Sequence, residues 1–284
     1  MTDRWTVRNV TLDLTRRPLL MGILNVTPDS FSDGGLFFDH QAAIEHGQQL
    51  VAEGADILDI GGESSRPGAC PVSAEEELRR VIPVVTALAE RVSVPISIDT
   101  SKAVVAREAI AAGASIVNDI TALRGDPQMV EVVRDTGVGV CVMHMKGTPQ
   151  TMQQEAIYRD VVAEVTGFLE SRCRELEMAG IKRDHIAIDP GLGFAKTPLH
   201  NWQIIAGLQR LRDLGYPLII GHSRKRFLRE VVGTDPRCLL QATVGVGVLL
   251  AAAGIDVLRI HDVKAMRQTL DFWQRNAVGS DPLA

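Results

Sequence analysis

The sequence predicts an α/β fold: a (β/α)8 TIM barrel preceded by a short N-terminal β-hairpin. Two observations carry this prediction. Strand-like runs rich in Ile, Val and Leu alternate with helix-like segments along the 284 residues, and polar side chains stand at the end of each run. Continuous apolar runs are typical of parallel strands that are buried on both faces. A single barrel also fits a chain of this length.

The predicted strands recur along the whole chain, and most lack the period-two alternation of a half-exposed sheet. An open doubly wound sheet is the alternative arrangement of such strands. It is disfavoured because no Gly-x-Gly-x-x-Gly motif follows the first strand. The predicted strands are Leu19–Val26, Ala55–Gly61, Pro95–Asp99, Ser115–Ile120, Val138–Met145, Ile186–Asp189, Pro217–Gly221 and Asp256–His261.

The segments between these runs have helical periodicity. In 73–92, apolar residues recur on one helical face, and Ser73 with Glu76 predicts a capping box at the start. Three further helices are predicted over 103–112, 156–178 and 198–214, each followed by a glycine. A glycine after a helix, with a strand shortly beyond it, is the connection expected in repeated β/α units.

The N-terminal segment differs from the rest of the chain. Residues 5–14 alternate between apolar and polar side chains, which predicts a small hairpin within residues 1–17. The barrel is expected over residues 18–276 and a short tail over 277–284. The whole chain, 1–284, is therefore predicted to be one domain.

Composition excludes several classes of protein. With 30 basic and 35 acidic residues the net charge is −5, which argues against nucleic-acid binding. No apolar run reaches the about 18–20 residues of a membrane span, and the N-terminus lacks the apolar core of a signal peptide. The four cysteines form no Cys-x-x-Cys pair, so neither zinc nor redox chemistry is indicated. A cytoplasmic protein is the simplest interpretation.

Polar side chains stand at or just after the ends of all eight predicted strands. In a barrel these ends meet at one mouth, where active sites lie. Helix caps alone explain an Asp or Ser after a strand, but not an amide inside a strand or an Arg-x-His pair. These residues are Asn25, Asp59, Asp99, Asn118, Asp119, His144, Asp189, Ser223, Lys225, Arg259, His261 and Asp262.

Eight motifs in this order resemble the dihydropteroate synthase family, the bacterial type of pterin-binding barrel. The first, second and last are the most specific. The motifs are MGILNVTPDSFSDGG (21–35), DIGGESSRPGA (59–69), SIDT (97–100), NDI (118–120), MHM (143–145), DPGLGF (189–194), SRK (223–225) and RIHDV (259–263).

The resemblance implies a transferase of folate biosynthesis. Such an enzyme condenses 6-hydroxymethyl-7,8-dihydropterin pyrophosphate with p-aminobenzoate to give 7,8-dihydropteroate and pyrophosphate. It also implies Mg²⁺ as cofactor, sulfonamides as inhibitors, and a homodimer formed through helices of the later half. The apolar segment 239–253 is compatible with that dimer, although a buried barrel helix would have the same pattern.

The resemblance also assigns site residues. The pterin is expected to bind to Asp99, Asn118, Ile120, Met143, Asp189, Phe194, Gly221 and Lys225. The pyrophosphate is expected to bind to Asn25, Arg66, Arg259 and His261, with Asn25 as the protein ligand of Mg²⁺. The aminobenzoate site is expected to comprise Ser65, Pro67, Ser223 and Lys225, and the mobile loops to contribute Thr27, Asp33 and Ser64. The catalytic residues are expected to be Asp99, Lys225, Arg259 and His261.

The expected mechanism is dissociative. Pyrophosphate leaves first, assisted by Mg²⁺, Arg259 and His261. Buried carboxylates such as Asp99 then stabilise a pterin-methyl cation until the neutral aryl amine attacks. The loops after the first two strands are expected to close over the substrates and exclude water.

Two other functions fit parts of the pattern. A pterin-dependent methyltransferase shares the barrel and the Asp–Asn–Asp set, but it does not need the Ser-Arg-Pro loop or the Arg-x-His pair. A non-catalytic pterin-binding paralogue would have lost loop or anion-binding residues. Four residues near these motifs receive structural interpretations: His144 and Cys141 as structural residues, His222 as a rim residue without a role, and Arg224 as part of a solvated charge run.

Overall fold

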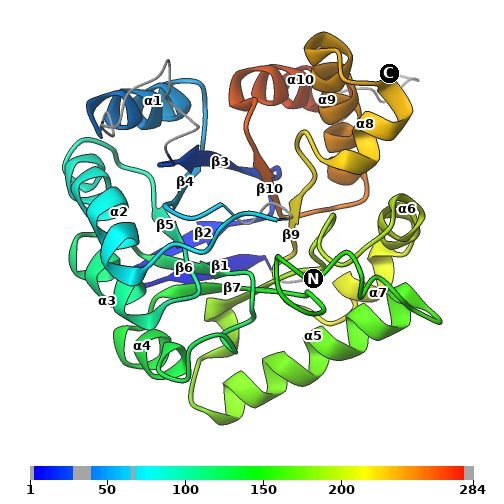
Figure 1. Cartoon of the computed structure of the whole chain (residues 1–284). Helices are drawn as coiled ribbons and strands as arrows, with labels where there is room; N and C mark the ends of the chain where they lie inside the picture. Colours follow the sequence, from blue (N-terminus) through cyan, green and yellow to red (C-terminus); the bar gives the residue numbers. More distant parts are fainter. Residues whose placement is uncertain (1–2, 28–39, 65–67, 278–284) are drawn as a thin grey trace.

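A closed parallel barrel forms the centre of the molecule (Figure 1). The computed structural model describes residues 3–27, 40–64 and 68–277. In strand order β8-β7-β6-β5-β4-β3-β10-β9, each pair is parallel, and a bridge between Ile188 and Leu218 joins β8 to β9 and closes the ring. The predicted barrel is therefore confirmed and the open doubly wound sheet is wrong. The strands are β3 (Leu19–Asn25), β4 (Ile57–Gly61), β5 (Ile96–Asp99), β6 (Ile116–Asp119), β7 (Gly139–Met143), β8 (Ile186–Asp189), β9 (Ile219–Gly221) and β10 (Val257–Ile260).

Helices surround the strands on the outside of the barrel, with α5 the longest of those described. Apolar side chains between the helices and the outer face of the strands form the largest core cluster. The helices are α1 (His40–Ala52), α2 (Ala74–Ala89), α3 (Ala103–Ala111), α4 (Met129–Thr136), α5 (Val161–Met178), α6 (Pro198–Ala206), α7 (Leu208–Arg212), α8 (Arg226–Val232), α9 (Pro236–Ala252) and α10 (Val263–Ala277). No helix in the described part of the chain is both long and apolar enough to span a membrane.

Two local predictions about the helices need correction. The expected single helix over 198–214 is divided into α6 and α7 at Gly207, where a Cβ atom would lie only 2.8 Å from Val162 of α5. The Ser73–Glu76 capping box is half formed: Ser73 accepts from the Glu76 backbone N–H, but the Glu76 carboxylate binds Arg79 and Arg80 instead. Both departures depend on contacts that the local sequence pattern does not contain.

The predicted N-terminal hairpin, β1 (Arg4–Val7) and β2 (Val10–Asp13), is confirmed, and it fills the amino end of the barrel. Trp5 and Val7 are fully buried against inward-facing residues of the strands, among them Met21 and Ile57. The Trp5 indole donates to the carbonyl of His185 at 3.0 Å. Because this end of the barrel is closed by apolar packing, the chemistry is confined to the opposite, carboxyl end.

Candidate active site

The registers of the strands bring the predicted pterin-binding residues to one level at the carboxyl end of the barrel. Asp99 of β5 pairs with Asn118 of β6, and Met143 of β7 pairs with Asp189 of β8. On the other side of the ring, Gly221 of β9 pairs with Arg259 of β10. Residues that are distant in the sequence thus surround one space.

A network of hydrogen-bonded charges crosses this space. Arg259 donates through Nε to Asp59 Oδ2 and through Nη2 to Asp99 Oδ2, each at 2.6 Å. Asn118 Nδ2 also donates to Asp59 Oδ2, at 3.1 Å. One carboxylate therefore orients both the guanidinium and the amide.

The sequence indicates Asp59 only as a polar residue at a strand end and predicts no role for it in the site. It is fully buried, and its Oδ1 has no hydrogen-bond partner among the described residues. The available signal was a carboxylate inside the otherwise apolar segment Ile57–Gly61 of β4. A buried charge at such a position requires a cation, and Arg259 is that cation.

Burial sets the protonation of the site. It raises the pKa of Asp99 to about 7, while Arg259 acts in the opposite direction. It also raises the pKa of Asp189, against the effect of Lys225. The neighbouring carboxylates hold the pKa of Arg259 above its usual value. Three acidic groups thus share two cations in a space of low dielectric constant.

Lys225, just after β9, contacts the loop that follows β8. Its Nζ donates to the carbonyl of Leu192 and lies 4.5 Å from the centroid of the Phe194 ring. Burial lowers the pKa of Lys225 to about 8, and Asp189 opposes this effect. Asp189 in turn accepts from the Gly191 N–H at 2.6 Å, which fixes the carboxylate.

Three of the residues predicted to bind the pterin lie in one small apolar cluster. Ile120 and Phe194 are half-buried and pack against Met143 together with Met145, Met152 and Ala195. The cluster connects the ends of β6, β7 and β8. It provides a flat apolar surface beside the polar groups, as a heteroaromatic ring requires.

The predicted anion-binding and aminobenzoate-binding residues also meet. His261, just after β10, has its Nδ1 3.0 Å from the hydroxyl of Ser223, which follows β9. Arg224, predicted to be a solvated residue, instead makes two hydrogen bonds to Asp262. That prediction is wrong in part: the guanidinium is half-exposed, but it joins the loops that carry Lys225 and His261.

His222 is not at the rim as predicted. It is fully buried, and its Nε2 lies 2.9 Å from the carbonyl of Thr243 in α9. The side chain turns away from the mouth because α9 packs closely behind β9: a Cβ at Gly247 would lie 3.3 Å from the same nitrogen. Cys141 and His144 are both buried, in agreement with their structural interpretation.

Asp33, Ser65, Arg66 and Pro67 lie outside the described residues, so their predicted roles remain predictions. The base of the loop that contains Ser65–Pro67 is described, and Ser64 is half-buried there, as Thr27 is after β3. A second cluster that the sequence did not reveal holds this base. Lys102 donates to Glu63 of the loop and to the fully buried Glu77 of α2, the latter at 2.5 Å.

Asn25 is the predicted ligand of Mg²⁺. It is half-buried at the carboxyl end of β3, paired with Gly61 of β4, and β3 also pairs with the strand that carries Arg259. No group of three or more His, Cys, Asp or Glu residues within the described ranges forms a metal site. One neutral oxygen fits an ion that arrives with a diphosphate and keeps most of its phosphate and water ligands.

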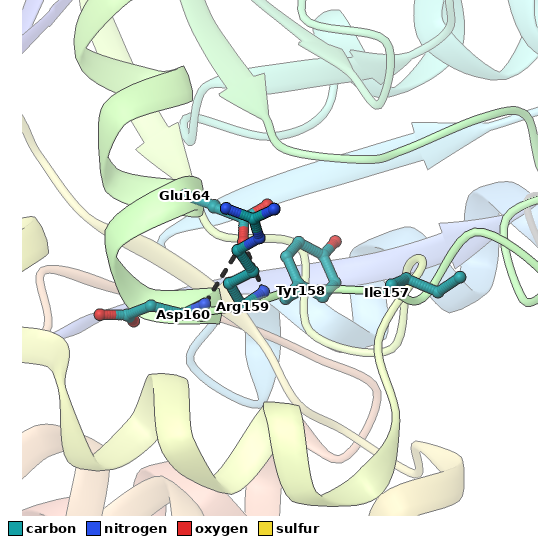
Figure 2. Close-up of a pocket in the computed structure, with 5 residues that line it drawn as sticks. All are labelled: Ile157, Tyr158, Arg159, Asp160 and Glu164. Carbon is teal, nitrogen blue, oxygen red and sulfur yellow. Dashed lines mark hydrogen bonds between the residues drawn. The ribbon is translucent and has the colours of Figure 1, made fainter.

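A hollow of about 450 Å³ lies away from the strand ends, at the start of α5 (Figure 2). Its lining includes Ile157 and Tyr158. The Glu164 carboxylate in it already accepts from the backbone N–H groups of Arg159 and Asp160 and pairs with Lys146. Asp160, the other acidic residue of the lining, accepts from the Ala163 backbone N–H at the start of α5. Since both carboxylates are engaged within the protein, this hollow offers a ligand no polar cluster comparable to that at the barrel mouth.

Comparison with known proteins assigns the family. Residues 21–261 match the family described as pterin binding enzyme. The chain is 45% identical to the dihydropteroate synthase of Escherichia coli strain K12 over 257 residues, which is 90% of each chain. This chain belongs to the dihydropteroate synthase family.

Solved structures of dihydropteroate synthases have the same fold throughout. The Xanthomonas albilineans dihydropteroate synthase with 4-aminobenzoic acid superposes with a TM-score of 0.91 at 47% identity, covering 99% of this chain and 100% of that one. The Yersinia pestis dihydropteroate synthase with a sulfonamide drug has the same TM-score at 42% identity, covering 97% and 99%. The likeness therefore extends over the whole barrel, including the described strand ends.

Proposed function

We propose that this chain is a dihydropteroate synthase. It condenses 6-hydroxymethyl-7,8-dihydropterin pyrophosphate with p-aminobenzoate, giving 7,8-dihydropteroate and pyrophosphate. One observation carries the proposal: in a member of this family, the predicted pterin-binding residues, which come from five different strands or the loops after them, converge on one space at the carboxyl end of the barrel. A methyltransferase is disfavoured because the chain has both the Ser-Arg-Pro loop and the Arg-x-His pair.

In this proposal the pterin lies against the cluster of Ile120, Met143 and Phe194. Asp189 accepts from the amino-pyrimidine edge, and Asn118 both donates and accepts. Lys225 donates to the ring from the other side. A flat heterocycle with several donors and acceptors needs a partner for each of them, because an unpaired buried polar group is costly.

The diphosphate lies near Arg259, His261 and Arg66. When bound, Mg²⁺ would neutralise charge on the leaving pyrophosphate, with Asn25 as its protein ligand. The guanidinium of Arg259 has the planar geometry that suits bidentate binding of phosphate oxygens. When it binds the diphosphate, its hydrogen bond to Asp99 is shared or broken. The net charge of −5 is no obstacle, since the cations are gathered at one mouth.

The reaction breaks the bond between the pterin methylene carbon and the pyrophosphate oxygen, and the electron pair leaves with pyrophosphate. The carboxylates of Asp99 and Asp59 stabilise the cation that remains. The amine nitrogen of p-aminobenzoate then forms the new C–N bond and loses one proton to solvent. The protein needs little acid–base strength, because the leaving group is already an anion.

The aminobenzoate site consists of Ser65, Pro67, Ser223 and Lys225. Ser223 is held in place by His261, so the two substrates meet beside Lys225. Sulfonamides resemble the aminobenzoate, and the Yersinia pestis relative has been solved with such a drug. We therefore expect sulfonamides to inhibit this enzyme competitively with p-aminobenzoate.

The function is tested by supplying both substrates with Mg²⁺ and detecting 7,8-dihydropteroate by mass spectrometry. Lys225→Ala is expected to lower kcat/KM by about 10²–10³-fold, as loss of one preorganised donor does. Arg224→Ala, the matched control at the neighbouring position, is expected to have a smaller effect because Arg224 acts only through Asp262. Absence of the product with wild-type enzyme would contradict the proposal.

The pKa of Lys225 gives a pH prediction. The protonated amine donates to the pterin, so kcat/KM for the dihydropterin pyrophosphate should fall about tenfold per pH unit above the pKa of about 8. Below pH 7 it should fall as well, because the Asp99 carboxylate takes up a proton there. The free energy of unfolding should change in the opposite sense. The pKa of Lys225 is about 8 in the folded state and 10.5 in the unfolded state, so the folded protein loses this proton first as the pH rises. The free energy of unfolding should therefore increase between pH 8 and 10.5, because the buried charge is removed.

Lys225→Arg is the matched variant for this pH profile. Its guanidinium stays protonated, so the decline above pH 8 should disappear even where the rate itself is reduced. An unchanged decline in this variant would assign the titration to another group.

We further propose that the protein is a cytoplasmic homodimer that contacts its second copy through α8 and α9. These helices are neighbours on the outside of the barrel, and Val231 and Leu249 project from them with exposures of 70% and 62%. Leu249→Arg should convert the dimer to a monomer in sedimentation velocity. The same change at Leu199 of α6, which is 64% exposed, should not. Monomeric wild-type protein would contradict the proposal.

A further inference from the structure

A buried lysine follows the Phe194 wall and has no part in the mechanism above. The Lys196 side chain is only 3% exposed. Its Nζ donates to the carbonyl of Phe194 at 2.9 Å and lies 3.0 Å from Nδ1 and 3.4 Å from the carbonyl oxygen of His144. One side chain thus connects the loop after β8 to the end of β7.

His144 is itself firmly anchored. Its backbone N–H donates to the carbonyl of Asp189 at 2.9 Å, and its ring packs edge-to-face on Phe168 with centroids 4.9 Å apart. Burial lowers the pKa of His144 to about 2, and Lys196 acts in the same direction, so the ring is neutral. A neutral imidazole has one nitrogen that accepts, and Nδ1 faces the Lys196 amine.

The loop that Lys196 holds has an unfavourable backbone. Gly191, Gly193 and Ala195 all have positive φ, at +69°, +83° and +50°. For Ala195 this conformation is unfavourable because the residue has a Cβ. Such a loop keeps its shape only when surrounding contacts hold it. Asn201 accepts from the Gly193 N–H at 2.8 Å, and Lys196 supplies the contacts on the far side of Phe194.

The position of this loop affects the pterin pocket directly. Phe194 packs with Ile120 and Met143 in the apolar wall, and the amine of Lys225 lies over its ring. Lys225 also donates to Leu192 in the same loop. A displacement of the loop would therefore move both the wall and the hydrogen-bond partner of Lys225.

We propose that Lys196 is a positioning residue for the pterin substrate: by fastening Phe194 to His144, it fixes the apolar wall against which the pterin ring binds. This inference rests on the proposed function. Lys196 does not touch the reacting atoms. Its loss should consequently weaken pterin binding most, since the wall it holds faces the pterin, and should affect p-aminobenzoate less, through Lys225 alone.

The test is Lys196→Met, which keeps an unbranched apolar side chain but removes the donors. Misplacement of the wall should raise KM for the dihydropterin pyrophosphate at least about tenfold. KM for p-aminobenzoate should rise less, because Ser223 lies on the loop after β9 and is held by His261, not by Lys196. If KM for the dihydropterin pyrophosphate is the same in Lys196→Met as in wild type, the proposal is overturned.

Two controls separate positioning from general stability. Val7→Ala removes buried volume at the opposite end of the barrel and should lower the melting temperature without changing either KM. Lys182→Met removes an exposed lysine before β8 and should change nothing. If Lys196→Met lowers only the melting temperature, as Val7→Ala does, the residue is structural and the proposal is wrong.

Calorimetric binding of 6-hydroxymethyl-7,8-dihydropterin, which has no leaving group, distinguishes this inference from the proposed function. Weaker binding to Lys196→Met than to wild type supports the inference even where no product forms. Equal binding to both proteins, with normal product formation by wild type, overturns the inference and leaves the proposed function intact.

Discussion

Replacement of Arg259 with methionine is expected to abolish most activity and to destabilise the fold together. The guanidinium donates to Asp59 and Asp99 at 2.6 Å, and the side chain is 19% exposed. Removing it leaves two carboxylates without their cation, and breaking such a pair costs about 3–5 kcal/mol of unfolding free energy. Loss of the charge that we propose binds the diphosphate should lower kcat/KM by about 10²–10³-fold.

Urea unfolding and initial rates measure the two effects of Arg259→Met. Because protonation of Asp99, whose pKa burial raises to about 7, removes one of the two facing charges, the destabilisation should be smaller at low pH than at neutral pH. Arg226→Met is the matched control: its side chain is 77% exposed and pairs with Glu230, one turn along α8, so both quantities should be nearly unchanged. If Arg259→Met has the same free energy of unfolding in urea as wild type, the network contributes no stability.

Trp5→Ala is expected to lower stability strongly while leaving the chemistry intact. The indole is fully buried in the amino end of the barrel and donates to the His185 carbonyl. Truncating a buried tryptophan costs about 3–5 kcal/mol. The site lies at the other end of the strands, so kcat at a temperature where the variant is folded should equal that of wild type.

Thermal unfolding of Trp5→Ala tests this separation of the two barrel ends. Val10→Ala, in the same hairpin but 48% exposed, is the control and should cost less than about 0.5 kcal/mol. A loss of kcat in folded Trp5→Ala would mean that the hairpin also positions the site, contrary to this account.

Much of the fold followed from local pattern. The strand Ile186–Asp189 has the predicted bounds, and the other strands lie within the predicted runs, because a buried parallel strand must be continuously apolar. Glycines 113, 180 and 215 follow their helices as predicted, and the structure gives each of them a positive φ. The break at Gly207 could not be predicted, because it depends on the close approach of Val162 from another helix.

The motifs predict which residues belong to the site, but not the hydrogen bonds that connect them. Asn118, Asp99 and Arg259 were each expected to face a substrate, yet the sequence does not indicate that Asp59 holds two of them. His222 was misplaced because its partner, the Thr243 carbonyl, is a backbone group of a helix beyond the motif. Hydrogen bonds between distant segments are a property of the fold and are not visible in residue type or spacing.

The central claim is most directly tested by measuring pyrophosphate release from the purified protein with the dihydropterin pyrophosphate and Mg²⁺, with and without p-aminobenzoate. The account predicts release that depends on p-aminobenzoate and matches the dihydropteroate formed one to one. Release that is absent, or that proceeds equally without p-aminobenzoate, would contradict it.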